Sequence, residues 1–115
     1  MSTPTSFLPS LQLRISLNDH KETVLLEDIM LLTSNGNYTS ITLSDGRTVL
    51  TCRTLKHYER CFAKGFVRVH RAYMVNRQYV SFVNHSQKVC ILSNGQRVPI
   101  TQRRFMSISK CLEAA

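Results

Sequence analysis

The chain has 115 residues, of which 43% are hydrophobic, and it carries a formal net charge of +8. This length suits one compact domain, and the apolar content is enough for a core without disulfides or a structural metal. No apolar run approaches the roughly 20 residues that span a bilayer, and no export signal is present, so we expect a cytoplasmic protein with no membrane-spanning segment.

The positive charge is concentrated in one part of the chain. Residues 47–112 hold thirteen Lys and Arg against a single acid, Glu59, whereas residues 1–46 carry a formal charge of −3. A field polarised in this way attracts polyanions over roughly a Debye length. The distribution therefore predicts a nucleic-acid partner, with an anionic membrane surface as the weaker alternative.

The first half of the chain is typical of short strands. Residues 1–10, MSTPTSFLPS, favour a flexible arm, so we expect the domain to span residues 11–115. Apolar residues then alternate with polar ones from Leu11 to Leu17, and Asn35-Gly36 and Asp45-Gly46 are turn dipeptides. Strands are expected over residues 11–17, 23–26, 29–33, 37–43 and 48–52.

One short helix interrupts this pattern. Thr54 is a candidate N-cap, after which Leu55, Tyr58 and Phe62 follow at helical spacing, and Gly65 stands where a helix would stop. Strands then resume over residues 66–69, 73–75, 79–83, 88–92 and 97–100. The connections between the strands of residues 11–52 are too short for crossover helices, so the sequence predicts an antiparallel meander there.

A second helix is expected from Thr101, which could cap it, with Phe105, Ile108 and Leu112 on its buried face. Arg103 and Arg104 would then occupy its first turn, where the helix dipole disfavours cations. Two readings stay open. The arginines lie on an ordinary exposed surface, or they meet a phosphate or a guanine edge at the helix N-terminus.

No residues of the sequence suggest catalysis or a cofactor. Nucleophile elbows, phosphate-binding loops and zinc-protease motifs are absent from the sequence, and its acids show no catalytic spacing. Cys52, Cys61, Cys90 and Cys111 form no CxxC pair, so we expect reduced and mostly buried thiols. His57 and Cys61 could share a metal ion across one helical turn, but no further ligands stand nearby, so no metal is expected.

Three motifs resemble the LytTR DNA-binding domain of bacterial response regulators. They are EDIMLLTSNGNYTSITLSDGRTVLTCRTLKHYERCF, then FVRVHRAYMVN, and then NGQRVPITQRR, in the order that the family shows. The resemblance covers about residues 11–112. It implies a mainly β fold, an elongated stack of small antiparallel sheets with one short central helix and a C-terminal helix.

The resemblance also implies that loops along one edge, and not a recognition helix, read successive major grooves. The base-contact candidates are Asn37, Tyr38, Arg71 and Arg103. Arginine suits the O6/N7 edge of guanine, and asparagine suits the N6/N7 edge of adenine. The phosphate-contact candidates are Lys56, Arg68, Arg77 and Arg104. His70 and Asn76 are expected to position loops, His70 by bonding backbone and Asn76 by forming a turn.

Family members usually follow a receiver domain or a membrane sensor, and this chain shows neither. We expect a stand-alone regulator, with a domain taken from a longer protein as the alternative. Useful specificity implies double-stranded DNA with repeated half-sites, and a homodimer on DNA is possible. Two alternatives remain. One is an interaction module that binds and blocks a partner regulator, and the other is a single-strand binder, for which only Tyr38 and Tyr79 offer stacking surfaces.

Overall fold

The computed structural model describes residues 12–17, 20–62 and 65–114, with side chains from residue 23 onward. The arm expected over residues 1–10 lies outside the described residues. Neither helix in the described part is long or apolar enough to cross a bilayer. The expected mainly β fold, with one central and one C-terminal helix, is confirmed.

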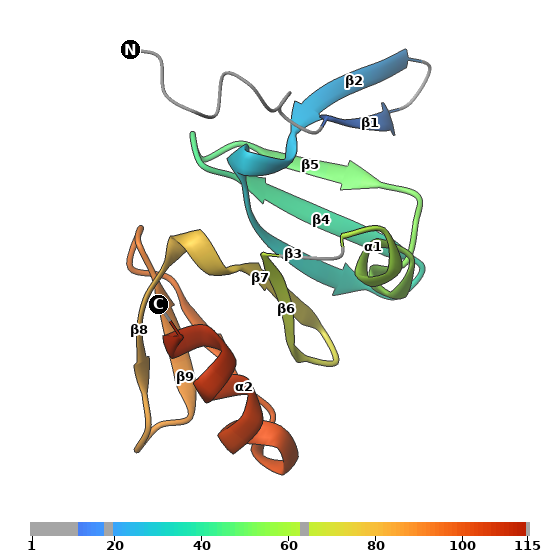
Figure 1. Cartoon of the computed structure of the whole chain (residues 1–115). Helices are drawn as coiled ribbons and strands as arrows, with labels where there is room; N and C mark the ends of the chain where they lie inside the picture. The colour runs from blue at the N-terminus through green and yellow to red at the C-terminus, as the bar shows by residue number, and fades with distance from the viewer. Residues whose placement is uncertain (1–11, 18–19, 63–64, 115) are drawn as a thin grey trace.

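The strands form three antiparallel sheets within the described residues (Figure 1). The largest has the order β5-β4-β3-β7-β6, formed by β5 (Thr48–Thr51), β4 (Tyr38–Leu43), β3 (Ile29–Asn35), β7 (Tyr73–Asn76) and β6 (Phe66–His70). The second has the order β10-β9-β8, formed by β10 (Arg97–Pro99), β9 (Val89–Leu92) and β8 (Val80–Asn84). The third is a ribbon of β1 (Gln12–Leu17) and β2 (His20–Leu25).

Strand β3 lies at the centre of the largest sheet because it is apolar on both faces. Ile29 and Leu32 belong to one buried cluster, together with Met74 of β7. Met30 and Leu31 belong to a second cluster on the opposite face. The meander predicted for the strands before the central helix is present in β3, β4 and β5, which pair in chain order. Strand β3 also pairs with β7, which follows it only after β4, β5, a helix and β6.

Helix α1 (Leu55–Cys61) covers one face of the large sheet. The Thr54 side chain accepts a hydrogen bond from the backbone N–H of His57 at 3.3 Å, so the predicted N-cap is present. Leu55 and Tyr58 are buried against the sheet, as their helical spacing predicts. This capping fixes where the helix begins, and therefore which side chains it directs toward β6.

Helix α2 (Phe105–Glu113) and the three-stranded sheet cover the other face. The predicted helix start at Thr101 is wrong, because Gln102–Arg104 form a separate 3₁₀ turn, η4. The Thr101 side chain makes no capping hydrogen bond, so nothing holds an α-helical first turn there. The chain bends at Arg104 and then buries Phe105 in the core.

The cysteine expectation is also partly wrong. Cys90 is buried in the core, but Cys52, Cys61 and Cys111 are exposed. All four are free thiols. Cys52, Cys61 and Cys111 lie in or beside elements in which other residues supply the apolar surface of the core. The hydrophobic character of cysteine alone therefore did not identify which thiol is buried.

Candidate nucleic-acid interface

Three turns meet at one end of the large sheet, and we call them the three-turn rim. They are the turn at residues 36–37 between β3 and β4, the turn at residues 71–72 between β6 and β7, and η4 before α2. In Figure 1 all three lie on the same side of the molecule. Gly36 has a φ of 75°, which explains why glycine stands at the first turn.

Backbone hydrogen bonds fix the turns relative to one another. The N–H of Ser34 donates to the carbonyl of Ala72 at 2.8 Å, and the N–H of Thr101 donates to the carbonyl of Val69 at 2.8 Å. The first bond joins the end of β3 to the turn at 71–72, and the second joins the residue before η4 to β6. The turn at 71–72 is therefore the middle of the rim.

An open pocket lies between the middle turn, η4 and α1. Its lining residues, which we call the basic pocket, are Glu59, Arg68, His70, Arg71, Thr101, Arg103 and Arg104. Four guanidinium groups face one carboxylate there, so the pocket carries a net positive charge whatever the state of the histidine. An anion of the size of a phosphate is the ligand that such a pocket favours.

Two of the predicted base-contact residues, Arg71 and Arg103, line this pocket and are exposed. Arg104, a predicted phosphate contact, lies beside them. The two arginines of η4 therefore stand in a tight turn that precedes α2, and not in the first turn of the α-helix itself. Arg104 is the N-cap residue of α2, so it still lies beside the positive end of the helix dipole.

The other base-contact candidates lie on the neighbouring turn. Asn37 is exposed in the turn, and Tyr38 begins β4 with 50% of its surface accessible. Asn35 closes the same hairpin by donating from Nδ2 to the hydroxyl of Ser40 at 2.6 Å. The hairpin therefore holds Asn37 and Tyr38 at the rim, outside the basic pocket.

The phosphate-contact candidates are dispersed. Lys56 is exposed on α1, three residues before Glu59 and hence on the same side of the helix. Arg77 follows the far end of β7, opposite the rim, where its guanidinium donates to the carbonyl of Ala114 at 3.0 Å and its Nε is buried without a hydrogen-bond partner. The structure therefore does not bring Arg77 together with the arginines of the pocket.

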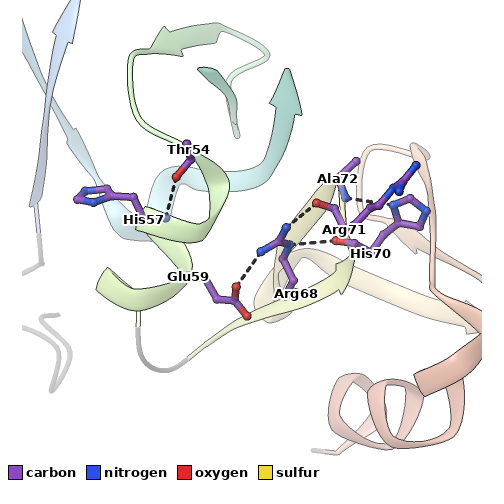
Figure 2. Close-up of polar contacts among 7 residues, drawn as sticks. All are labelled: Thr54, His57, Glu59, Arg68, His70, Arg71 and Ala72. Carbon is purple, nitrogen blue, oxygen red and sulfur yellow. Dashed lines mark hydrogen bonds and ion pairs between the residues drawn. The ribbon is translucent and has the colours of Figure 1, made fainter. Parts of the chain in front are cut away.

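Arg68 makes the largest number of polar contacts at the rim (Figure 2). Its Nε donates to the carbonyl of His70 at 3.0 Å and one terminal nitrogen donates to the carbonyl of Arg71. The other terminal nitrogen forms an ion pair with Glu59 at 2.7 Å. Its side chain is only 23% exposed, unlike a freely presented phosphate contact.

The two residues expected to position loops make backbone contacts. The Nδ1 of His70 accepts a hydrogen bond from the N–H of Ala72 at 3.1 Å, which bridges the middle turn (Figure 2). The amide of Asn76 donates to the carbonyl of Ile29 at 2.8 Å and accepts from the N–H of Gln78 at 3.1 Å. Asn76 is buried, so its place is inside the sheet and away from the rim.

Glu59 is the pocket residue that was not selected from the sequence. The one feature of the sequence that could have identified Glu59 is that it is the single acid among residues 47–112. Its partner, Arg68, is nine residues away in the chain and on another element. A pairing of this kind follows from the packing of α1 beside β6, and local periodicity does not report it.

Within the part of the chain that the structure describes, no group of three or more potential metal ligands occurs. The Sγ of Cys61 and the Nε2 of His57 lie 3.6 Å apart on α1. The marked pKa changes lie away from the rim. Burial raises the pKa of Cys90 to about 11, and a backbone N–H of Arg47 lowers the pKa of Asp45.

Comparison with known proteins agrees with this geometry. The family model of the LytTr DNA-binding domain matches residues 19–113. A solved structure described as the LytTr DNA-binding domain of a putative methyl-accepting/DNA response regulator from Bacillus cereus has a similar fold, with a TM-score of 0.74 and 23% identity over 93% of this chain and 99% of that chain. No curated protein matches the sequence.

LytTR is a family of DNA-binding domains and not of enzymes, which fits a protein that takes part in transcription regulation without catalysis. The matched region includes all three turns of the rim and both helices. Because the family model covers most of the sequence, the chain belongs to the LytTR family of DNA-binding domains.

Proposed function

We propose that the chain is a sequence-specific regulator of transcription, of bacterial type, that binds double-stranded DNA through the three-turn rim. The observation that carries this proposal is the basic pocket, which gathers Arg71, Arg103 and Arg104 from two separate elements. Loops and a 3₁₀ turn, and not a recognition helix, then reach the grooves.

The order of the turns supports contact between the rim and a major groove. The turn at 36–37, the turn at 71–72 and η4 follow one another across the sheet order β4-β3-β7-β6 and the Thr101–Val69 hydrogen bond. Strands lie about 4.8 Å apart, so the rim spans roughly 15 Å of backbone, compared with about 12 Å for the width of the major groove. The backbone of the rim is thus about as wide as one major groove, whereas successive major grooves on one face of the duplex lie about 34 Å apart, so the rim by itself fills one groove.

Each exposed side chain of the rim has a matching partner on DNA. Arg71 and Arg103 suit guanine through paired hydrogen bonds to O6 and N7, and Asn37 suits adenine through N6 and N7. Tyr38 offers an apolar ring beside Asn37 for contact with a thymine methyl. Arg104 and Lys56 suit the phosphates that orient the protein without reading sequence.

The distribution of acids supports one orientation of the domain. Asp28 precedes β3 and Asp45 lies in the turn after β4, and a bond of 2.8 Å from the N–H of Ser44 to the carbonyl of Asp28 joins these positions. This end of the sheet is opposite the rim, because β3 and β4 are antiparallel and connect at residues 36–37. Asp45 pairs there with Arg47 at 2.9 Å, and Arg77 lies at the same end, so the charges of this end largely cancel. A polyanion is therefore attracted more strongly to the rim than to the other end.

Selection from a random duplex library, followed by sequencing, tests sequence specificity. A regulator enriches one motif, and a family of unrelated sequences would contradict the proposal. We expect the motif to occur as repeated half-sites bound by two copies, since one domain of this size contacts few base pairs.

A salt titration on random duplex separates DNA binding from the interaction-module alternative. Neutralising roughly six phosphates gives a log-log slope near −5. A weak, salt-insensitive association would favour the module that binds a partner regulator. No contact among the described residues specifically favours that alternative.

A further inference from the structure

The Arg68 side chain is committed to the backbone of the middle turn. It donates to the carbonyls of His70 and Arg71 from two different nitrogens. These carbonyls flank the Cα of Arg71, so their orientation sets the direction in which the Arg71 side chain leaves the turn. A third nitrogen of the same guanidinium pairs with Glu59.

The middle turn is irregular and depends on such contacts. The register between β6 and β7 shifts between Arg68 and His70, so the regular ladder of hydrogen bonds is interrupted there. The N–H of Ala72 is bound by the ring of His70, and its carbonyl is bound by Ser34. Arg68 supplies the remaining contacts, on the carbonyls that precede Ala72.

Glu59 is an unexpected residue in a pocket for an anion. A carboxylate beside three exposed arginines repels phosphate, and it therefore lowers affinity for every DNA sequence alike. Among the described contacts of the pocket, only the ion pair between Glu59 and Arg68 gives Glu59 a role that offsets this loss of affinity. Glu59 thus lowers the affinity for DNA of any sequence, and at the same time it holds the guanidinium of Arg68, which orients the middle turn.

We propose that Glu59 and Arg68 act as a clamp on the middle turn, in which Arg68 is a positioning residue for Arg71 in place of the phosphate contact expected from the sequence. This inference rests on the proposed DNA-binding function. The clamp determines how strongly the protein distinguishes its preferred site from random DNA, and contributes little to overall attraction.

The substitution Arg68→Lys distinguishes a positioning role of Arg68 from a phosphate contact, because lysine keeps the positive charge and loses the planar guanidinium. A single ammonium on a flexible stem cannot reach two carbonyls and a carboxylate in this arrangement. A phosphate contact would tolerate lysine. The clamp predicts a loss of about tenfold in affinity for the preferred site, the scale of a lost charge-assisted hydrogen bond, with random-DNA affinity within about twofold.

The substitution Glu59→Gln tests the second half of the clamp, and because Glu59 is exposed it leaves the fold intact. The ratio of specific to random affinity should fall about two- to fivefold, the scale of an exposed ion pair. Random-DNA affinity should not fall. The matched control is Glu113→Gln, which removes the same charge from another exposed pair, His85–Glu113, and should leave the ratio unchanged.

The experiment measures both affinities for the wild type and the three variants, together with the amide chemical shifts of Arg71 and Ala72 in the free proteins. Support requires lower ratios and shifted amides in Arg68→Lys and Glu59→Gln, and neither in the control. Unchanged ratios, or equal losses on both DNAs, would overturn the clamp while the proposed function stands. A wild type without any preferred site would instead overturn the proposed function.

Discussion

At the scale of the residue, the partner of each arginine decides its role more than its charge does. Arg71 and Arg103 are exposed in the basic pocket, whereas Arg68 is held by one carboxylate and two carbonyls. Arg77 is fixed to the carbonyl of Ala114 at the other end of the sheet. The sequence suggested phosphate contacts for both Arg68 and Arg77, and only the structure shows that their guanidinium groups bond to other parts of the chain.

We predict that Arg71→Ala and Arg103→Ala each cost about 1–3 kcal/mol on the preferred site and less on random DNA, because each removes a paired contact to a base edge. Fluorescence anisotropy with both duplexes measures the difference. Lys110→Ala is the control, since it removes an exposed cation outside the basic pocket. Equal losses on both duplexes would reassign Arg71 and Arg103 to phosphates.

Cys90 gives the domain a pH-dependent contribution to stability. Burial raises its pKa from 9.0 to about 11, so the folded state holds the thiol proton more tightly than the unfolded state does. This stabilisation is present in full below pH 9 and is lost as the pH rises toward 11. Urea unfolding across this range should show a decline that is smaller in Cys90→Ala, and an equal decline in both proteins would contradict the assignment.

At the scale of the element, α1 and η4 position the charged groups of the basic pocket. Helix α1 brings Glu59 to Arg68, and η4 brings Arg103 and Arg104 to Arg71. The cap of α1 was predictable because Thr54 and the apolar spacing after it are local features. The 3₁₀ turn was not, because it depends on Thr101 bonding to Val69 of another strand and on Phe105 entering the core.

Removal of the α1 cap should weaken the domain. Thr54→Ala leaves the N–H of His57 without its side-chain acceptor, and we expect a loss of about 0.5–2 kcal/mol in the free energy of unfolding. Chemical denaturation measures it. Thr54→Ser keeps the hydroxyl and should remain close to the wild type. If both variants lose the same free energy, the methyl group and not the cap stabilises the helix start.

At the scale of the whole molecule, the large sheet separates the basic rim from an end where Asp28 and Asp45 lie with Arg47 and Arg77. β3 runs from Asp28 to the turn at 36–37, so the same strand that forms the centre of both clusters also sets the distance between the two ends. The composition predicted a polarised charge, and the antiparallel pairing of β3 with β4 and β7 turned it into a spatial asymmetry. The exposed arginines of the basic pocket consequently lie together at one end of the sheet.

Two copies on one duplex should depend on the helical phase of the half-sites. If both bind the same face, shifting the half-sites by about 5 bp should abolish joint binding, and a shift of about 10–10.5 bp should restore it. Electrophoretic mobility with spaced duplexes tests this. Binding that ignores spacing would show that the copies act independently, and a single half-site duplex is the control for the affinity of one copy.

The sequence by itself determined the features that depend on near neighbours: the alternating strands, the turn dipeptides, the cap at Thr54 and the excess of cations in residues 47–112. The tertiary structure decided which strands pair and which arginines meet. Asn76 bonds to Ile29, which is 47 positions away in the chain. Strand β3 is apolar on both faces and therefore lies inside the sheet, where β7 is its second neighbour. Such contacts depend on how distant apolar faces pack together, and a local pattern of residues contains no information about that packing.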